Sequence, residues 1–155
     1  MSKKLVAYFS ASGVTKRLAE KLAGTIGADL FEICPQTPYS EADLNWKNPL
    51  ARCNREWIGK KVVPISGQVQ NMQDYQSLYI GFPIWYGCAP NIINTFAEQY
   101  DLSGKQIVLF ATSGGSGIGK TAEKLEAHLG GVKVADAKVL RADISETELK
   151  NWAVF

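Results

Sequence analysis

Apolar segments of strand length alternate with segments of helical periodicity along most of this 155-residue chain. The apolar segments are short, nearly continuous and rich in strand-forming residues, as strands buried on both faces are. Strands are predicted at residues 5–9, 30–33, 78–82, 107–111 and 134–140, and helices at 14–26, 91–99, 118–129 and after the capping box that begins at Ser145. This alternation predicts an α/β fold, a three-layer α/β/α sandwich around a five-stranded parallel sheet.

Residues 36–73 do not follow this pattern. They contain Pro38, Pro49 and Pro64, and a helix-like stretch at residues 50–58 without a strong period. The sequence therefore assigns no regular element to this part of the chain.

The composition is that of an ordinary globular protein, with 46% hydrophobic and 21% charged residues. A net charge of +2, carried by scattered basic residues, indicates neither nucleic acid nor a membrane surface as a partner. Three cysteines without C-x-x-C spacing and one histidine argue against a disulfide framework and a metal site. With no signal-peptide pattern and no apolar membrane span, we expect a soluble cytoplasmic protein.

The loop after the first predicted strand leads directly into a helix. Ligands of open parallel sheets bind beyond the carboxyl ends of the strands, so this loop is a candidate site. It contains the hydroxyls of Ser10, Ser12 and Thr15, and helix N-terminal amides attract anions. The loop therefore predicts a bound phosphate group, and the alternative is that Ser12 only caps the helix.

The loop after the third predicted strand carries two adjacent aromatic residues, Trp85 and Tyr86, between Pro83 and Gly87. Loops run over protein surfaces, so two rings here are expected to be exposed. They suggest a platform on which a planar ligand stacks. The alternative is that both rings only cover the edge of the core.

The loop after the fourth predicted strand has the sequence T-S-G-G-S-G-I-G-K-T. Its last eight residues, from Gly114 to Lys120 and Thr121, match the Walker A pattern. A nucleotide-binding phosphotransferase that uses this loop is therefore an alternative function. In P-loop proteins, however, the motif follows an early strand, whereas here only residues 122–155 come after it. No apolar strand ends in an aspartate suited to a Walker B role. We expect Lys120 and Thr121 on the solvent side of the next helix.

Together the three loops resemble those of the flavodoxin-like FMN-binding proteins, and most closely the short flavodoxin type. The resemblance lies in Y-F-S-x-S-G-x-T at residues 8–15, G-x-P-I-W-x-G-x-x-P-x-x-x-x-x-F at 81–96 and T-S-G-G-S-G-I-G at 112–119. It covers almost the whole chain. It implies a single flavodoxin-like domain over residues 1–155, with strand order 2-1-3-4-5 and FMN bound non-covalently.

By this resemblance the first loop would hold the FMN phosphate, the second would flank the isoalloxazine ring, and amides of the third would line the pyrimidine edge. The implied cofactor-binding residues are Ser10, Ala11, Ser12, Gly13, Val14, Thr15, Pro83, Ile84, Trp85, Tyr86, Gly87, Thr112, Ser113, Gly114, Gly115, Ser116 and Gly117. Amides aimed at the ring would favour the negative charge of a reduced flavin. No catalytic side chain and no metal are implied, since the flavin carries the redox chemistry.

The resemblance implies either an electron carrier or an NAD(P)H-dependent reductase of quinone-like acceptors. Its partners would be a redox protein or a small-molecule acceptor, with NAD(P)H as a candidate donor, and the chain would be a monomer or a homodimer. Two features depart from the family pattern. Val14 stands where asparagine is common, and the net charge of +2 contrasts with the strongly acidic electron carriers, which weakens the carrier role.

Overall fold

The computed structural model describes residues 3–10, 13–37, 40, 42–44, 47–48, 50–53, 56, 63–85, 89–113, 117–118, 120–141 and 143–153. Its main sheet has five strands: β1 (Lys4–Tyr8), β2 (Asp29–Glu32), β5 (Ser77–Pro83), β6 (Gln106–Thr112) and β7 (Val134–Val139). They lie in the order β2-β1-β5-β6-β7, and every neighbouring pair is parallel. Numbered by themselves, these strands have the order 2-1-3-4-5, so the fold implied by the resemblance is confirmed.

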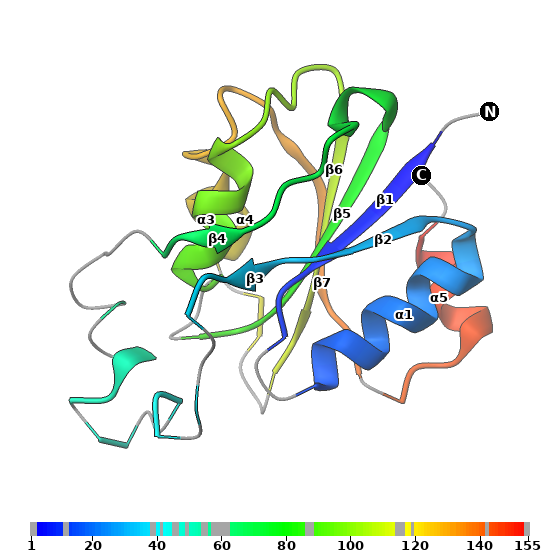
Figure 1. Cartoon of the computed structure of the whole chain (residues 1–155). Helices are drawn as coiled ribbons and strands as arrows, with labels where there is room; N and C mark the ends of the chain where they lie inside the picture. Colours follow the sequence, from blue (N-terminus) through cyan, green and yellow to red (C-terminus); the bar gives the residue numbers. More distant parts are fainter. Residues whose placement is uncertain are drawn as a thin grey trace.

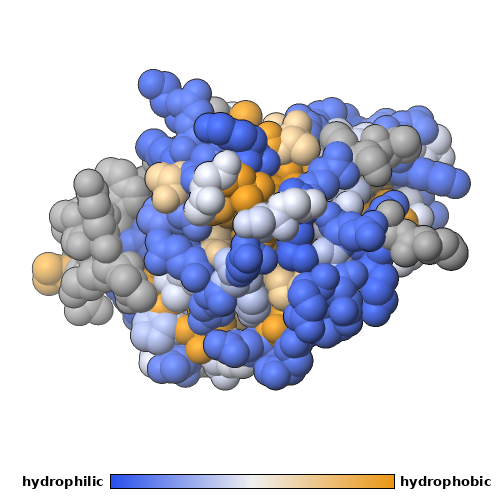
Figure 2. Space-filling model, turned by 90° about the horizontal axis from the view of Figure 1, so that it is seen from above, coloured by the Kyte–Doolittle hydropathy of each residue, from blue (hydrophilic) through white to orange (hydrophobic). Residues whose placement is uncertain are grey.

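Helices cover both faces of the sheet, which confirms the three-layer architecture (Figure 1). One face carries α1 (Val14–Ile26) and α5 (Glu146–Trp152), and the other carries α3 (Asn91–Glu98) and α4 (Thr121–Glu126). None of the helices in the described part of the chain has the length and hydrophobicity that a membrane span requires. Seen from above, the molecule shows a mostly hydrophilic surface with small hydrophobic patches (Figure 2).

Successive residues of the central strands point into two separate hydrophobic cores. In β1, Leu5 and Ala7 belong to the core under α3 and α4, whereas Val6 and Tyr8 belong to the core under α1 and α5. All four side chains are at most 3% exposed. Because both faces of the sheet are buried, the strands read as continuous apolar runs and not as alternating ones.

The ends of the predicted helices are set by glycines and by one hydroxyl. Gly13 is the N-cap of α1 and Gly27 its C-cap, with φ of 92° and 68°, in a region that favours glycine. Ser12, the alternative cap, lies outside the described residues. The predicted capping box of α5 is confirmed, since Ser145 Oγ accepts a hydrogen bond from Glu148 N at 3.1 Å.

Two parts of the chain differ from the sequence-based expectation. Residues 36–73 contribute to a short antiparallel pair, β3 (Cys34–Pro35) with β4 (Ile65–Ser66), and to a 3₁₀ turn at Met72–Asp74. The helix predicted at 118–129 is shorter, because only α4 is regular helix. After α4 the amides bond to carbonyls three residues back, so the chain continues in tight turns.

Candidate functional site

The carboxyl ends of β1, β5 and β6 are neighbours at one edge of the sheet, in the lower part of Figure 1. Backbone hydrogen bonds continue just beyond the strands. Phe9 N donates to Gly81 O at 2.9 Å, and Ile84 N donates to Thr112 O at 2.8 Å. The structure therefore brings the beginnings of all three predicted loops together.

The first loop turns the chain into α1 and presents the N-terminus of this helix at the site edge. Gly13 N donates to Ser10 Oγ at 3.0 Å, which closes the turn. Thr15 is buried, Val14 is half-buried, and the first turn of α1 contains no acidic residue. Helix N-terminal amides without a nearby carboxylate form a favourable place for an anion. Ala11, which belongs to the same predicted set, lies outside the described residues, as Ser12 does.

A buried pair of hydroxyls joins the first loop to the third. Thr15 Oγ1 and Thr112 Oγ1 are 2.8 Å apart, and the two residues are only 2% and 6% exposed. Thr112 also accepts the amide of Ile84 from the second loop through its carbonyl. One residue at the end of β6 therefore contacts both other loops.

The second loop holds a tryptophan in a defined orientation. The rings of Trp85 and Phe9 meet edge to face, with centroids 5.6 Å apart and planes at 85°. Phe9 is buried, whereas Trp85, Pro83 and Ile84 are half-buried. Trp85 therefore packs on the core, as the alternative interpretation expected, and still exposes part of its ring. Tyr86 and Gly87 lie outside the described residues.

Thr121, which ends the Walker A match in the third loop, is not placed as the hydroxyl of a P-loop. Thr121 is fully buried, and its Oγ1 donates to Ile118 O, whereas a Walker A hydroxyl must reach a metal ion. The expectation that Thr121 faces solvent is thus wrong, because its hydroxyl is used inside the turn that starts α4. Lys120 is exposed, as expected.

Of the remaining predicted residues in this loop, Ser113 is half-buried and Gly117 is exposed. Gly114, Gly115 and Ser116 lie outside the described residues.

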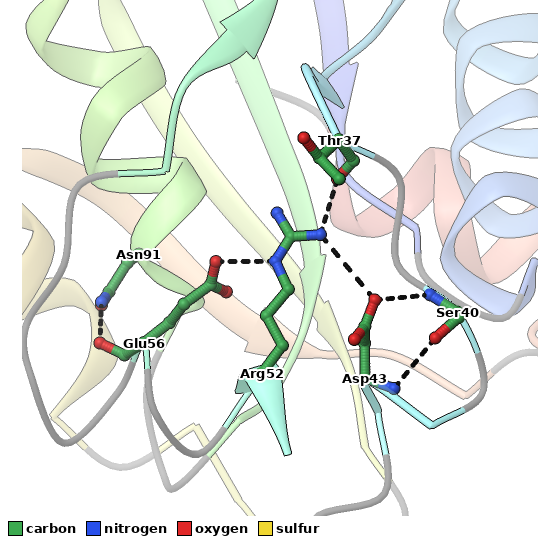
Figure 3. A network of polar contacts seen from close by, with 6 residues as sticks. All are labelled: Thr37, Ser40, Asp43, Arg52, Glu56 and Asn91. Carbon is green, nitrogen blue, oxygen red and sulfur yellow. Dashed lines mark hydrogen bonds and ion pairs between the residues drawn. The ribbon is translucent and has the colours of Figure 1, made fainter. Parts of the chain in front are cut away.

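A polar network that sequence reasoning missed fixes the segment before β4 (Figure 3). Arg52 Nη1 donates to Thr37 O at 2.7 Å and lies 3.9 Å from Asp43 Oδ2, and Arg52 Nε donates to Glu56 Oε2 at 3.0 Å. The side chains of Arg52 and Glu56 are only 16% and 14% exposed. The only sequence signal was the i, i+4 spacing of these two residues, which opposite charges favour in a helix.

This network also reaches the second loop. Asn91 Nδ2, at the start of α3, donates to Glu56 O at 2.8 Å. A small cavity between the segment and the loop is lined by Cys53, Glu56, Trp85, Pro90 and Asn91. The network therefore holds the segment against the residues around Trp85.

Two ionisable groups near the first loop, the Tyr8 hydroxyl and the Cys34 thiol, share one carboxylate as hydrogen-bond acceptor. Tyr8 Oη donates to Glu32 Oε2 at 3.3 Å, and Cys34 Sγ donates to Glu32 Oε1 at 3.4 Å. Burial, reinforced by the charge of Glu32, raises the pKa of Tyr8 to about 12. Burial and the hydrogen bond to Glu32 also raise the pKa of the Cys34 thiol. Both groups stay protonated at neutral pH, so neither is a base or a nucleophile.

A larger hollow, of about 470 Å³, lies between the C-terminal ends of α3 and α4. Glu98 and His128, whose side chains are hydrogen-bonded to each other, are on its wall. None of the predicted site residues that the structure describes lines it. Within the described residues, no group of three acidic, histidine or cysteine side chains is placed to hold a metal ion.

The order of the strands and the loops at their carboxyl edge place this chain among the doubly wound α/β proteins that bind a ligand where the strand order reverses. Comparison with known proteins then defines the family. The family model described as Flavodoxin matches residues 3–154, and the chain belongs to the flavodoxin family.

Solved structures agree with this assignment. A provisionally named flavoprotein from Bacteroides eggerthii DSM 20697 is 42% identical, with a TM-score of 0.92, over 98% of this chain and 96% of that one. A second, from Bacteroides uniformis ATCC 8492, is 37% identical, with a TM-score of 0.91, over 97% of both chains. A flavoprotein in complex with FMN, from Lactobacillus acidophilus NCFM, is 23% identical, with a TM-score of 0.75, over 99% of both chains. No curated protein matched.

Proposed function

We propose that this protein binds FMN non-covalently at the carboxyl edge of the sheet and works as a flavin-dependent oxidoreductase. The observation that carries the proposal is the position of Thr112. It joins an anion-attracting helix N-terminus, through Thr15, to the loop that holds the half-buried ring of Trp85. A phosphate site next to an aromatic ring suits a ligand that has a phosphate and a planar ring system. Family membership and the FMN complex of the Lactobacillus acidophilus protein support FMN as that ligand.

In this proposal the residues bind and orient the cofactor, and FMN supplies the redox chemistry when it is bound. The N-terminus of α1, with Ser10 and Thr15, holds the phosphate. Trp85 shields one side of the ring from water, and backbone amides near Ser113 and Gly117 face the pyrimidine edge. Tyr8 and Cys34 stay protonated and take no part in proton transfer at neutral pH.

We favour an NAD(P)H-dependent reductase of small quinone-like acceptors over an electron carrier. Lys16 and Arg17, in the first turns of α1, and Lys120, at the start of α4, are exposed beside the ligand loops. Positive charges around a site attract anionic reactants such as a dinucleotide. We place the protein in the reducing cytoplasm, which agrees with the free thiol of Cys34.

The test is to titrate the purified chain with FMN and then to supply NADH or NADPH together with a quinone. Stoichiometric FMN binding and rapid reduction of the quinone are the expected results. Binding of FMN without turnover of either nucleotide would leave the carrier role and exclude the reductase. Binding of Mg-ATP in place of FMN would instead support a phosphotransferase that uses the loop ending at Thr121.

A further inference from the structure

We propose that Thr112 is a positioning residue for the phosphate of FMN. Its hydroxyl orients the hydroxyl of Thr15, so that Thr15 donates its proton to the phosphate, and Thr112 itself touches no ligand atom. This inference rests on the proposed function. It differs from the role that the family resemblance implies, because that role groups Thr112 with the loop at the ring edge.

The first step is the geometry of the pair. The two hydroxyl oxygens are 2.8 Å apart and belong to residues 97 positions apart in the sequence. Thr15 is in the first turn of α1, and Thr112 is the last residue of β6. Within the described residues, each hydroxyl has the other as its hydrogen-bond partner. The contact is therefore a specific link between two elements that a ligand at this edge would meet.

The second step is a count of protons. Each threonine hydroxyl has one proton to donate and can accept two hydrogen bonds. The bond between Thr15 and Thr112 uses one of the two protons. No acceptor for the other proton is found among the residues that the structure describes, and a buried donor without an acceptor is costly. An anion at the N-terminus of α1 supplies that acceptor, since Thr15 is in the turn whose amides face the anion.

The third step is the direction of the bond. If Thr112 donates to Thr15, the remaining proton is the one on Thr15, where the phosphate would bind. Thr112 becomes the donor when a phosphate accepts the Thr15 proton, and its fixed backbone holds its hydroxyl in place beside Thr15. It pairs with Pro83 in the sheet, its carbonyl accepts Ile84 N at 2.8 Å, and the preceding Ala111 accepts Leu140 N at 2.8 Å. A side chain on a strand with neighbours on both sides holds its hydrogen-bond partner in a more precise position than a side chain on a loop does.

The experiment compares the affinities of FMN and riboflavin, which differ only in the phosphate group. Thr112→Val removes the hydroxyl and keeps the shape. It should weaken FMN binding about tenfold and leave riboflavin binding unchanged. Thr112→Ser keeps the hydroxyl and should restore most of the FMN affinity. Thr25→Val is the matched control, because it removes another hydrogen-bonded hydroxyl of α1, 2.7 Å from Lys21 O, and should change neither affinity.

A double-mutant cycle tests whether Thr112 acts through Thr15. In a Thr15→Val background, Thr112→Val should have no further effect on FMN affinity, whereas independent roles would give additive losses. Additive losses would overturn the inference. Equal weakening of FMN and riboflavin would also overturn it, because Thr112 would then act on the ring.

The same measurements separate this inference from the proposed function. A wild-type chain that binds no FMN overturns the proposed function and this inference with it. A wild-type chain that binds FMN as tightly as Thr112→Val does overturns only this inference. If circular dichroism shows that Thr112→Val does not fold, Thr112→Ala takes its place beside Thr112→Ser. An alanine variant that binds FMN as well as the serine variant would then overturn the inference.

Discussion

The aromatic ring of Phe110 fills the space that a side chain at Gly81 would need. Phe110 Cζ lies 2.2 Å from the position of a Cβ built on Gly81, far inside any tolerable contact. Both residues are in central strands, where neighbouring backbones cannot move apart without breaking the sheet. The glycine of the G-x-P-I-W motif is therefore explained by packing in the core and needs no direct role in ligand binding.

Gly81→Ala should destabilise the fold by about 3 kcal/mol, because overpacking a rigid core forces side chains or backbone out of place. Chemical denaturation of the ligand-free protein measures this loss. Gly24→Ala is the control, since Gly24 is inside α1 and has open space around its Cβ position. It should stabilise the protein by about 0.5–1 kcal/mol. An unchanged midpoint for Gly81→Ala would show that the ring of Phe110 moves aside easily.

Phe9→Leu should weaken FMN binding, because the edge-to-face contact with Phe9 holds the ring of Trp85 in its orientation. The same change should lower stability by about 1–2 kcal/mol, through lost volume and the lost ring contact. Phe96→Leu is the control. Phe96 is buried and packs on Tyr100 with ring centroids 5.1 Å apart. The Phe96→Leu variant should lose a similar amount of stability and keep its FMN affinity. Equal losses of FMN affinity in the two variants would contradict a specific role for Phe9.

Arg52→Lys should loosen the segment around Arg52 although it keeps the charge. One ammonium group cannot reproduce the two hydrogen bonds that the guanidinium makes to Thr37 O and Glu56 Oε2. We expect local opening to become easier by about 2 kcal/mol, seen as faster limited proteolysis between residues 37 and 56. Arg141→Lys is the control, because Arg141 forms its ion pairs at the surface, where such pairs contribute little. Equal cleavage rates in the two variants would contradict this prediction.

The stability of the protein should fall as the pH rises from 10 to 12. Tyr8 has its pKa raised from 10.0 to about 12 in the folded state, so in this range the folded state binds more protons than the unfolded state. Its contribution is fully present below pH 10 and is lost as the pH approaches 12. Tyr8→Phe should flatten this part of the stability curve, measured by denaturation at each pH. A curve parallel to that of the wild type would show that other groups cause the decline.

The sequence predicted the elements whose pattern is repeated and missed those without one. Leu18 and Leu22, one helical turn apart, marked α1, whose bounds agree with the prediction. The strands β3 and β4 have two residues each, too few to show a period. The end of α4 was missed because local turns replaced helical hydrogen bonds after Glu126, although the residues that follow are compatible with a helix.

The site was predictable as a set of loops and not as a set of contacts. Strand order brings the three loops to one edge, and this could be argued from the alternation of strands and helices. The bond from Thr15 to Thr112 and the packing of Phe9 on Trp85 join residues distant in the sequence, and no spacing rule connects them. The Arg52 network was hidden for a different reason, because most of its members are in a part of the chain without a clear period.

The separation of the two cores by the sheet has a mechanical consequence. Phe9, which supports Trp85, belongs to the core on the α3 and α4 side, whereas Thr15 is on α1, on the opposite side. A ligand that contacts both Thr15 and Trp85 therefore spans the sheet from one layer to the other. A bound ligand would link the two layers at this edge of the sheet. Unfolding either layer would then break contacts to the ligand, so the two layers should unfold together when the ligand is bound.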